Sequence, residues 1–396
     1  MLRPRLDRDG ELWKPLAGLG PNEALIDAAG SRARLSTPAL VLDLNRFEAN
    51  VATMAAWAKD AGVNLRPHAK MHKTPQVAEA QIAAGAVGIC CATVGEAEVM
   101  VAAGIPDVLI TSPAVAPGKP ERVAALNRAA RRLAVVADHP ENVATLAAAN
   151  ASGDRPLTVY LEVDVGSART GVTEAAAGVA VVEAIRAHDS LRFGGVQAYA
   201  GYLQHMPDYD ERRAELERAM APLRDVLAAL AEIGVRPEVV TGGGSGSHRM
   251  DPEMGLLTEL QVGSYCVMDV DYDRIDFVGG GGAPPYLPAL FVQATAINVN
   301  HCDTAIVDAG LKVFATDGPL PRFADGVPVG ATFRFKGDEH GAVVYGDANE
   351  RLALGDTVLI EAPHCDPTVN LHDFLHCVRG DLLVDIWPIA ARGTSV

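Results

Sequence analysis

Three short stretches of this chain hold side chains that can do chemistry, and the first is LRPHAKMHKTP, which begins at residue 65. Its basic or potentially basic side chains are Arg66, His68, Lys70, His72 and Lys73. A lysine whose pKa is lowered by neighbouring cations or by burial can form a Schiff base with a carbonyl group. We expect the surrounding cations to lower the pKa of Lys70 in this way, with Lys73 as the alternative reactive lysine. For a lone lysine, a solvated position on a loop is the ordinary explanation.

The second stretch is TGGGSGS, which begins at residue 241, and it is accompanied by a shorter GSY at residue 263. The residues concerned are Thr241, Gly242, Gly243, Gly244, Gly263, Ser264 and Tyr265. Glycine-rich loops expose backbone N–H groups that bind phosphate, although either loop alone is also explained as a flexible turn. A phosphorylated carbonyl cofactor that reacts with a lysine is pyridoxal 5′-phosphate (PLP), so the two stretches together predict a PLP site.

The third stretch is PHCDP, in which His364 and Asp366 are separated by one residue. In an extended segment these two side chains project to the same side, where they can bind one metal ion, while Cys365 points away. Imidazole and carboxylate ligands suit Mn²⁺ or Mg²⁺, whereas a cysteine thiolate would favour Zn²⁺. A surface loop rich in His and Asp is the alternative explanation.

The elements that must position these residues follow a repeated pattern. Eight β-rich runs alternate with alanine-rich stretches of helical period, which indicates an α/β fold, a (β/α)8 TIM barrel. The runs cover residues 65–70, 87–94, 107–113, 133–138, 158–166, 193–199, 238–244 and 259–265. Lys70 then ends the first strand, and the glycine-rich loops follow the last two strands, which is a common phosphate site in barrels. A doubly wound open sheet is the alternative, but no early turn has its GxGxxG fingerprint.

After the barrel, short alternating runs broken by Gly, Pro and Asp predict an all-β domain. The strand-like PALVLDL, which begins at residue 38, precedes the first barrel helix and is expected to join this domain. The predicted organisation is an N-terminal segment of the β domain (1–40), a PLP-binding barrel (41–275) and a C-terminal β domain with the metal site (276–396). The acidic VMDVDYDRID between them lacks the glycine and glutamate of an EF-hand, so we interpret it as a solvated linker.

Composition excludes several classes of partner. The chain has 396 residues and a formal net charge of −16, which disfavours nucleic acid or an anionic membrane surface as partner. No uncharged run approaches the roughly 18 apolar residues of a membrane span, and the start lacks an apolar signal core. The six cysteines show no CxxC spacing, which fits reduced thiols. We therefore expect a cytoplasmic protein.

Four motifs carry a family resemblance: RPHAKMHK, GAVGICCATVGEAE, QAYAGYLQH and PHCDPTVNLHD. Together they resemble the D-threonine aldolase and D-serine dehydratase family, whose PLP enzymes have the alanine racemase type of barrel and β domain. The resemblance implies that Lys70 forms the Schiff base, with His68 beside the cofactor. It also implies that Arg169 and Tyr199 hold the pyridine side, and that the glycine-rich loops hold the phosphate. Members are typically dimers, so a homodimer is expected by analogy.

The same resemblance implies a divalent metal at His364 and Asp366, because aldolases of the family share His-x-Asp while the dehydratases tend to show His-x-Cys with zinc. This favours a metal-activated aldolase that cleaves D-threonine or D-allo-threonine to glycine and acetaldehyde. His205, after the sixth strand, is the candidate base for the proton of the substrate's β-hydroxyl, since a neutral imidazole accepts a proton near pH 7. A partly exposed loop histidine is its alternative interpretation.

Other functions stay open at this point. A D-serine dehydratase and a D-3-hydroxyaspartate aldolase are close neighbours of the favoured activity. For a 3-hydroxyaspartate, a basic side chain is expected at the substrate entrance, from a set that comprises Lys312, Asp317, Glu339 and His340. A PLP carrier without catalysis is disfavoured by the extra β domain. A barrel metal hydrolase is disfavoured because only the first strand carries histidines at its end.

Overall fold

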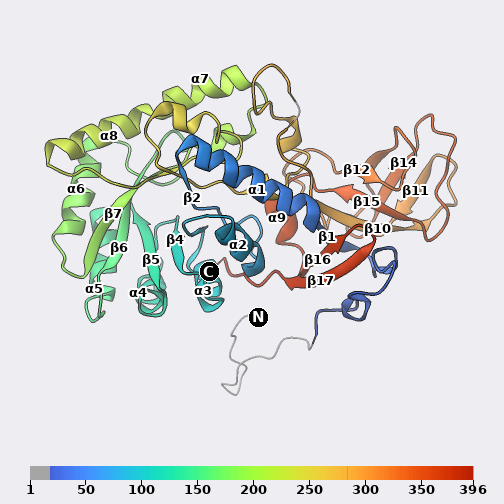
Figure 1. The fold of residues 1–396 in the computed structure, drawn as a ribbon, viewed down its shortest axis with the longest axis horizontal. Coiled ribbons are helices and arrows are strands. Elements are labelled where there is room, and N and C mark those ends of the chain that lie inside the picture. The colour runs from blue at the N-terminus through green and yellow to red at the C-terminus, as the bar shows by residue number, and fades with distance from the viewer. Residues whose placement is uncertain (1–17, 283, 396) are drawn as a thin grey trace.

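The computed structural model describes residues 18–282 and 284–395 as an eight-stranded barrel beside a second domain built mostly from strands (Figure 1). Residues 1–17 lie outside the described residues. The expectation of no signal core and the first part of the predicted N-terminal segment (1–40) both depend on these residues. No helix within the described ranges is long and apolar enough to cross a membrane.

The barrel contains eight parallel strands in the order β2-β9-β8-β7-β6-β5-β4-β3. Their bounds are β2 (Asn64–Leu65), β3 (Ile89–Cys91), β4 (Asp107–Ile110), β5 (Arg132–Ala137), β6 (Leu157–Val163), β7 (Leu191–Ala198), β8 (Val240–Gly242) and β9 (Glu259–Leu260). A parallel bridge between His68 and Cys90 joins the two ends of this order. The predicted (β/α)8 barrel is therefore confirmed, and the doubly wound open sheet is not formed.

Helices alternate with these strands and cover the outside of the barrel (Figure 1). They are α1 (Leu44–Ala61), α2 (Pro75–Ala83), α3 (Val94–Ala102), α4 (Lys119–Ala129), α5 (Pro140–Ala149), α6 (Ala175–Arg186), α7 (Tyr209–Ala219) and α8 (Ala221–Glu232). Short 3₁₀ turns of the barrel are η3 (Gly201–His205), η4 (Asp251–Met254), η5 (Ser264–Cys266) and η6 (Tyr272–Arg274). Local signals set the ends: the Asp43 carboxylate accepts two backbone N–H groups at the start of α1, and Gly62 ends that helix with a φ of +70°.

The second domain is organised around a nine-stranded sheet with the order β13-β14-β11-β10-β1-β16-β17, while β15 pairs with both β10 and β12. Its elements are η1 (Glu23–Leu25), η2 (Arg32–Arg34), β1 (Ala39–Asp43), β10 (Leu290–Asn298), β11 (Thr304–Val307), β12 (Arg322–Asp325), β13 (Thr332–Phe335), β14 (Gly341–Val344), β15 (Thr357–Glu361), α9 (Cys365–Val369), β16 (Phe374–Arg379) and β17 (Leu382–Pro388). The strand expected from PALVLDL is β1, and it lies between β10 and β16.

The acidic segment between the two domains is not a solvated linker, so that prediction is wrong. Asp269 is fully buried, and its carboxylate accepts the backbone N–H groups of Tyr272 and Cys365, each at 2.8 Å. Asp273 forms an ion pair with Arg322 of β12. The carboxylates of this segment therefore fasten the barrel to the second domain, through partners that are distant in sequence.

Candidate active site

Lys70 follows β2 at the carboxyl end of the first barrel strand, as predicted. Its Nζ lies 3.7 Å from Oδ2 of Asp366, which belongs to the second domain. The same Nζ lies 5.8 Å from the ring centroid of Tyr199, which follows β7. The structure therefore brings together three residues that are far apart in the sequence and that come from both domains.

The other cations of LRPHAKMHKTP do not surround Lys70. The Arg66 guanidinium pairs with Glu259 at 2.8 Å and with Asp107 at 2.7 Å, and both carboxylates lie at the first residues of their strands, the opposite end of the barrel. Lys73 forms a buried ion pair with Glu96. This pair leaves Lys70 as the lysine with access to the predicted site, because the ammonium group of Lys73 is already bound.

The two histidines of the stretch carry no charge at neutral pH. Burial, followed by the nearby Lys70 charge, lowers the pKa of His68 well below its ordinary value, and burial lowers the pKa of His72 to about 3. For Lys70 itself, burial acts to lower the pKa, but the Tyr199 and Asp366 side chains outweigh it and the pKa is raised. The prediction that neighbouring cations lower the pKa of Lys70 is therefore wrong.

His68 takes a positional role beside Lys70. Its Nδ1 accepts the backbone N–H of Lys70 at 3.3 Å, so the single proton of the neutral ring sits on Nε2. That Nε2 donates to Oγ1 of Thr111 at 3.1 Å, and the Thr111 hydroxyl donates to the carbonyl oxygen of Cys91. This chain of hydrogen bonds fixes the backbone that carries Lys70.

The glycine-rich loops after β8 and β9 lie against each other. Oγ of Ser245 accepts the backbone N–H groups of Gly263 and Tyr265, at 3.3 and 3.0 Å. A Cβ at Gly244 would lie 2.5 Å from Oε1 of Gln204, so this position has no room for a larger residue. Thr241 is placed differently, because its hydroxyl accepts a hydrogen bond from the Gln261 side chain.

These loops fit a phosphate group. The backbone N–H groups of Gly243, Ser245 and Ser264 are buried and have no hydrogen-bond acceptor in the described part of the chain. Buried N–H groups without an acceptor are rare in folded proteins, so three of them on two touching loops indicate that an anion completes the site. The predicted phosphate loops thus have the donors that PLP requires.

Arg169 and Tyr199 form the opposite wall. Arg169 lies on the loop after β6, and its guanidinium carbon is 5.8 Å from the Tyr199 ring centroid, the same distance as Lys70 Nζ. Oγ of Ser167 donates to the Tyr199 carbonyl oxygen at 3.2 Å, which connects the two loops. The residues predicted for the pyridine side are therefore neighbours of Lys70.

His364 and Asp366 do not lie on an extended segment, and this step of the sequence argument is wrong. His364 has extended backbone angles and caps α9, whereas Asp366 lies in the first turn of that helix. In the described residues no group of three or more His, Cys, Asp or Glu side chains is placed to hold a metal ion. A metal bound here would have His364 and Asp366 as its protein ligands, with water or substrate in the remaining positions, as Mg²⁺ and Mn²⁺ accept.

A second histidine, His205, lies beside His364, with the two imidazole rings edge-on to each other. The rings of His205 and His364 have centroids 5.8 Å apart. Nδ1 of His205 is 2.7 Å from Oδ2 of Asp271, and Nδ1 of His364 is 2.9 Å from Oδ2 of Asp317. Since a carboxylate accepts hydrogen bonds, each Nδ1 donates, and in the neutral form of either ring Nε2 has the lone pair that binds a proton or a metal ion.

The roles of several residues were not found from the sequence. Asp271 and Ser245 lie in stretches that the sequence singled out, but the contacts of Asp271 with His205 and of Ser245 with Gly263 and Tyr265 join residues at least 18 positions apart, so they could not be read from spacing. Asp317, which the sequence offers only for the substrate entrance, contacts His364, and its role at an entrance stays a prediction. Lys312 of the same set is exposed and paired with Glu339.

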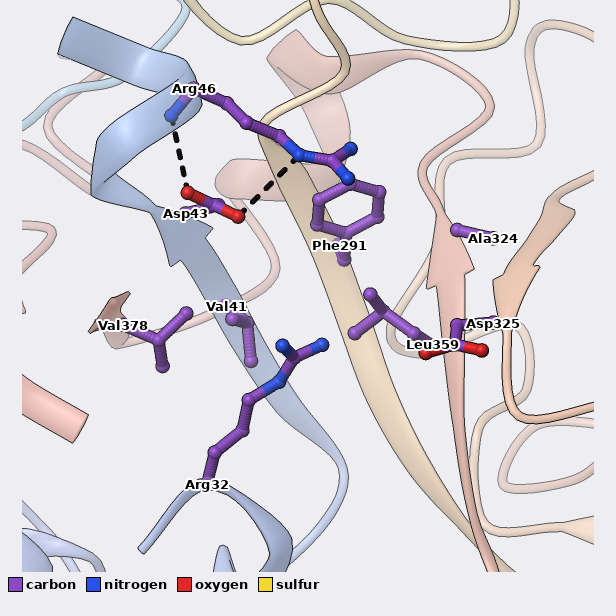
Figure 2. Close-up of a pocket in the computed structure, with 9 residues that line it drawn as sticks. All are labelled: Arg32, Val41, Asp43, Arg46, Phe291, Ala324, Asp325, Leu359 and Val378. Carbon is purple, nitrogen blue, oxygen red and sulfur yellow. Dashed lines mark hydrogen bonds and ion pairs between the residues drawn. The ribbon is translucent and has the colours of Figure 1, made fainter. Parts of the chain in front are cut away.

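A pocket of about 300 Å³ lies elsewhere, on the second sheet (Figure 2). Its lining residues are Arg32, Val41, Asp43, Arg46, Phe291, Ala324, Asp325, Leu359 and Val378. Figure 2 shows Arg46 bound to Asp43, and the same guanidinium donates to the carbonyl oxygen of Pro288. None of the predicted site residues lines this pocket, and we assign it no role.

Comparison with known proteins agrees with this geometry. The family model described as "Alanine racemase, N-terminal domain" matches residues 42–271, and the one described as "Putative serine dehydratase domain" matches residues 289–378. The fold and the site around Lys70 thus define a PLP-dependent enzyme of the alanine racemase type.

Two relatives and one solved structure, all aldolases, place the chain within a smaller family of these PLP-dependent enzymes. The chain is 40% identical over 364 residues to a D-threonine aldolase of Arthrobacter sp, covering 92% of this chain and 94% of the relative. It is 38% identical over 364 residues to a 3-hydroxy-D-aspartate aldolase of Paracoccus denitrificans (strain Pd 1222), covering 91% and 93%. The crystal structure of D-threonine aldolase from Filomicrobium marinum matches with a TM-score of 0.87 at 41% identity, over 92% of this chain and 98% of that one. The chain belongs to the D-threonine aldolase and D-serine dehydratase family of PLP-dependent lyases.

Proposed function

We propose that this protein is a metal-activated, PLP-dependent aldolase that cleaves D-β-hydroxy-α-amino acids, with D-threonine or D-allo-threonine giving glycine and acetaldehyde. The observation that carries the proposal is the approach of Lys70 to Asp366, 3.7 Å between Nζ and Oδ2, together with the edge-on contact of the His205 and His364 rings. The residues that we propose as reactive lysine, metal ligands and base therefore lie close together, which supports the proposal. The two aldolase relatives support the reaction class.

The residues that would hold the cofactor are those of the barrel mouth. Lys70 would bind its aldehyde carbon, and the N–H groups of Gly243, Ser245 and Ser264 would bind its phosphate. Tyr199 would face the pyridine ring, with Arg169 beside it. When bound, PLP supplies an electron sink at the substrate's α-carbon, and a divalent cation supplies a positive charge near its hydroxyl.

Proton transfer is assigned to His205. Because Asp271 accepts from Nδ1, the lone pair of Nε2 is available to take the proton of the β-hydroxyl as the carbon–carbon bond breaks. Asp271 keeps the ring in the required tautomer and orientation, in the way that carboxylates hold catalytic histidines. His364 is held in the same way by Asp317, which leaves its Nε2 for the metal ion.

The side chain two positions after His364 distinguishes the aldolase pattern from the dehydratase pattern, and in this chain it is Asp366, with Cys365 as the neighbouring alternative ligand. Cys365 is fully buried, its backbone N–H is bound to Asp269, and burial raises the pKa of its thiol well above the ordinary value. Zinc binds the thiolate form, and a thiol without exposed surface is harder to deprotonate than an exposed one. The available ligand is therefore the Asp366 carboxylate, which supports Mn²⁺ or Mg²⁺ ahead of Zn²⁺ and cleavage ahead of dehydration.

Product analysis tests the proposal. The protein is incubated with PLP, Mn²⁺ and D-threonine, and in parallel with D-serine and D-3-hydroxyaspartate. Acetaldehyde and glycine from D-threonine support the aldolase, whereas ammonia and a 2-oxo acid without glycine would refute it. A strong preference for D-3-hydroxyaspartate would keep the aldolase chemistry and change the substrate.

Two variants test the proposed roles of Lys70 as the Schiff-base lysine and of His205 as the base. Lys70→Ala is expected to lose the visible absorbance of PLP bound through a lysine, and retention of that band would move the assignment to Lys73. His205→Ala is expected to keep the absorbance and lose the cleavage. Near-normal turnover of His205→Ala would remove this residue from the role of base.

We also propose that the protein works as a homodimer in the cytoplasm. All six cysteines are free thiols, which supports a reducing compartment. Light scattering of the purified protein should give twice the chain mass of 41.5 kDa. A monomeric mass in the active preparation would contradict the dimer.

A further inference from the structure

A buried histidine that the proposed reaction does not use lies behind the glycine-rich loops. His248 has no exposed surface, and its ring is packed edge-on against Trp57 of α1, with centroids 4.6 Å apart. The rings of Tyr286 and Phe277 lie 5.5 and 6.0 Å away. This aromatic enclosure leaves the imidazole only the two hydrogen bonds that its nitrogens make.

The direction of both hydrogen bonds follows from the chemistry of the partners. Nδ1 of His248 lies 2.7 Å from the carbonyl oxygen of Ser245, which can only accept, so Nδ1 carries a proton. Burial lowers the pKa of His248 to about 3, so the ring is neutral and Nε2 has none. Nε2 therefore accepts the hydroxyl proton of Tyr286, at 2.9 Å. The hydrogen bonds run in one direction, from Tyr286 through His248 to Ser245.

Ser245 is the residue that joins the two phosphate loops. Its carbonyl oxygen is held by His248, and its hydroxyl oxygen accepts the N–H groups of Gly263 and Tyr265, which flank Ser264. Its own N–H is one of the three buried donors that find no acceptor among the described residues. A shift of Ser245 would therefore displace donors on both loops.

We propose that Tyr286 and His248 are positioning residues for the cofactor's phosphate: their hydrogen bonds hold Ser245 so that the N–H groups of Ser245 and Ser264 converge on one anion. This inference rests on the PLP site of the proposed function. It assigns a role to a pair of residues that do not touch the cofactor and lie outside the cleavage chemistry.

The test compares two ligands that differ only in the phosphate. The full-length protein, freed of cofactor, is titrated with PLP and with pyridoxal, and the dissociation constants are read from the visible absorbance. Tyr286→Phe removes one buried hydroxyl, and we expect PLP to bind about 5- to 10-fold more weakly while pyridoxal changes by less than about twofold. Tyr345→Phe is the matched control, because Tyr345 is equally buried and its hydroxyl makes a hydrogen bond far from the phosphate loops, accepting the backbone N–H of Leu352 in the second domain.

Two His248 variants separate positioning from packing. His248→Asn keeps a donor near the position of Nδ1 and should bind PLP within about threefold of the unchanged protein, whereas His248→Leu keeps the volume and should lose about tenfold or more. Equal weakening of PLP and pyridoxal, or no weakening in Tyr286→Phe, would overturn the inference and leave the proposed function standing. Failure of the unchanged protein to bind PLP at all would overturn both.

Discussion

Glu162 of β6 provides a test of how the barrel interior is built. Its side chain is buried, and Oε1 accepts hydrogen bonds from Thr170 at 2.9 Å and from the Gln197 side chain at 3.2 Å. Oε2 is buried without a partner among the described residues. Burial, the largest influence, raises the pKa of this carboxyl from 4.5 to about 7. The native protein thus holds a proton here that the unfolded chain releases at lower pH.

The sign and size of the effect on stability follow from this difference in pKa. Between pH 4.5 and 7 the native state binds more protons than the unfolded state, so the free energy of unfolding falls as the pH rises through this window and levels off above it. A difference of 2.5 pKa units at 1.36 kcal/mol each amounts to about 3 kcal/mol. Glu162→Gln removes the ionisation and keeps the shape, so this loss should disappear in the variant.

Thermal unfolding at two pH values measures the effect. At pH 5 the melting temperatures of Glu162→Gln and the unchanged protein should agree within about 1 °C. At pH 8 the variant should melt about 4 °C higher. This difference is the stability gain of about 3 kcal/mol divided by the unfolding entropy of the chain, which is about 2.1 cal/mol/K per residue. Glu183→Gln, at an exposed position on α6, is the control and should show no pH-dependent difference. An equal difference at both pH values, or a lower melting temperature of Glu162→Gln at pH 8, would refute the reasoning.

Three further predictions concern the buried ion pair, the candidate base and the metal. Glu96→Gln leaves the buried ammonium of Lys73 without its charge partner, and the melting temperature should fall by about 4–6 °C; an unchanged melting temperature would show that the pair adds nothing. Asp271→Asn should lower kcat by about 10- to 100-fold, with the cofactor absorbance intact, because His205 loses the carboxylate that fixes its tautomer; full turnover would contradict this role. Chelation with EDTA should abolish cleavage and Mn²⁺ should restore it, and full activity of the chelated protein would speak against a metal.

The barrel and its site could be predicted because each depends on local patterns. Strands and helices alternate in the sequence, and the carboxyl ends of parallel strands meet at one edge, so Lys70 and the glycine-rich loops had to be neighbours. The first strand is shorter than expected, Asn64–Leu65 instead of 65–70, although single backbone hydrogen bonds continue beyond it, from Arg66 to Leu260 and from His68 to Val262. His68 still forms the bridge that joins β2 to β3.

The electrostatics could not be predicted, because charge partners are set by the fold. Arg66 is neutralised by Asp107 and Glu259, which stand 41 and 193 positions away. The number of cations in LRPHAKMHKTP therefore predicted the wrong direction for the pKa of Lys70, because Arg66 and Lys73 are paired with carboxylates elsewhere. His364 and Asp366 could be picked out by their residue types, but the sequence did not predict the backbone between them. The helix α9 begins at Cys365, and its start has no strong sequence signal.

The place of β1 in the second sheet has a consequence for synthesis on the ribosome. Its parallel partner β16 is the last strand but one in the sequence, and 336 positions separate Leu40 from His376, which share a hydrogen bond. At bacterial or eukaryotic elongation rates of about 5–20 residues per second, β1 waits roughly 17–67 s with an open edge while the whole barrel emerges after it. During this time β1 cannot pair with β16, and its unpaired backbone groups are open to pairing with other chains.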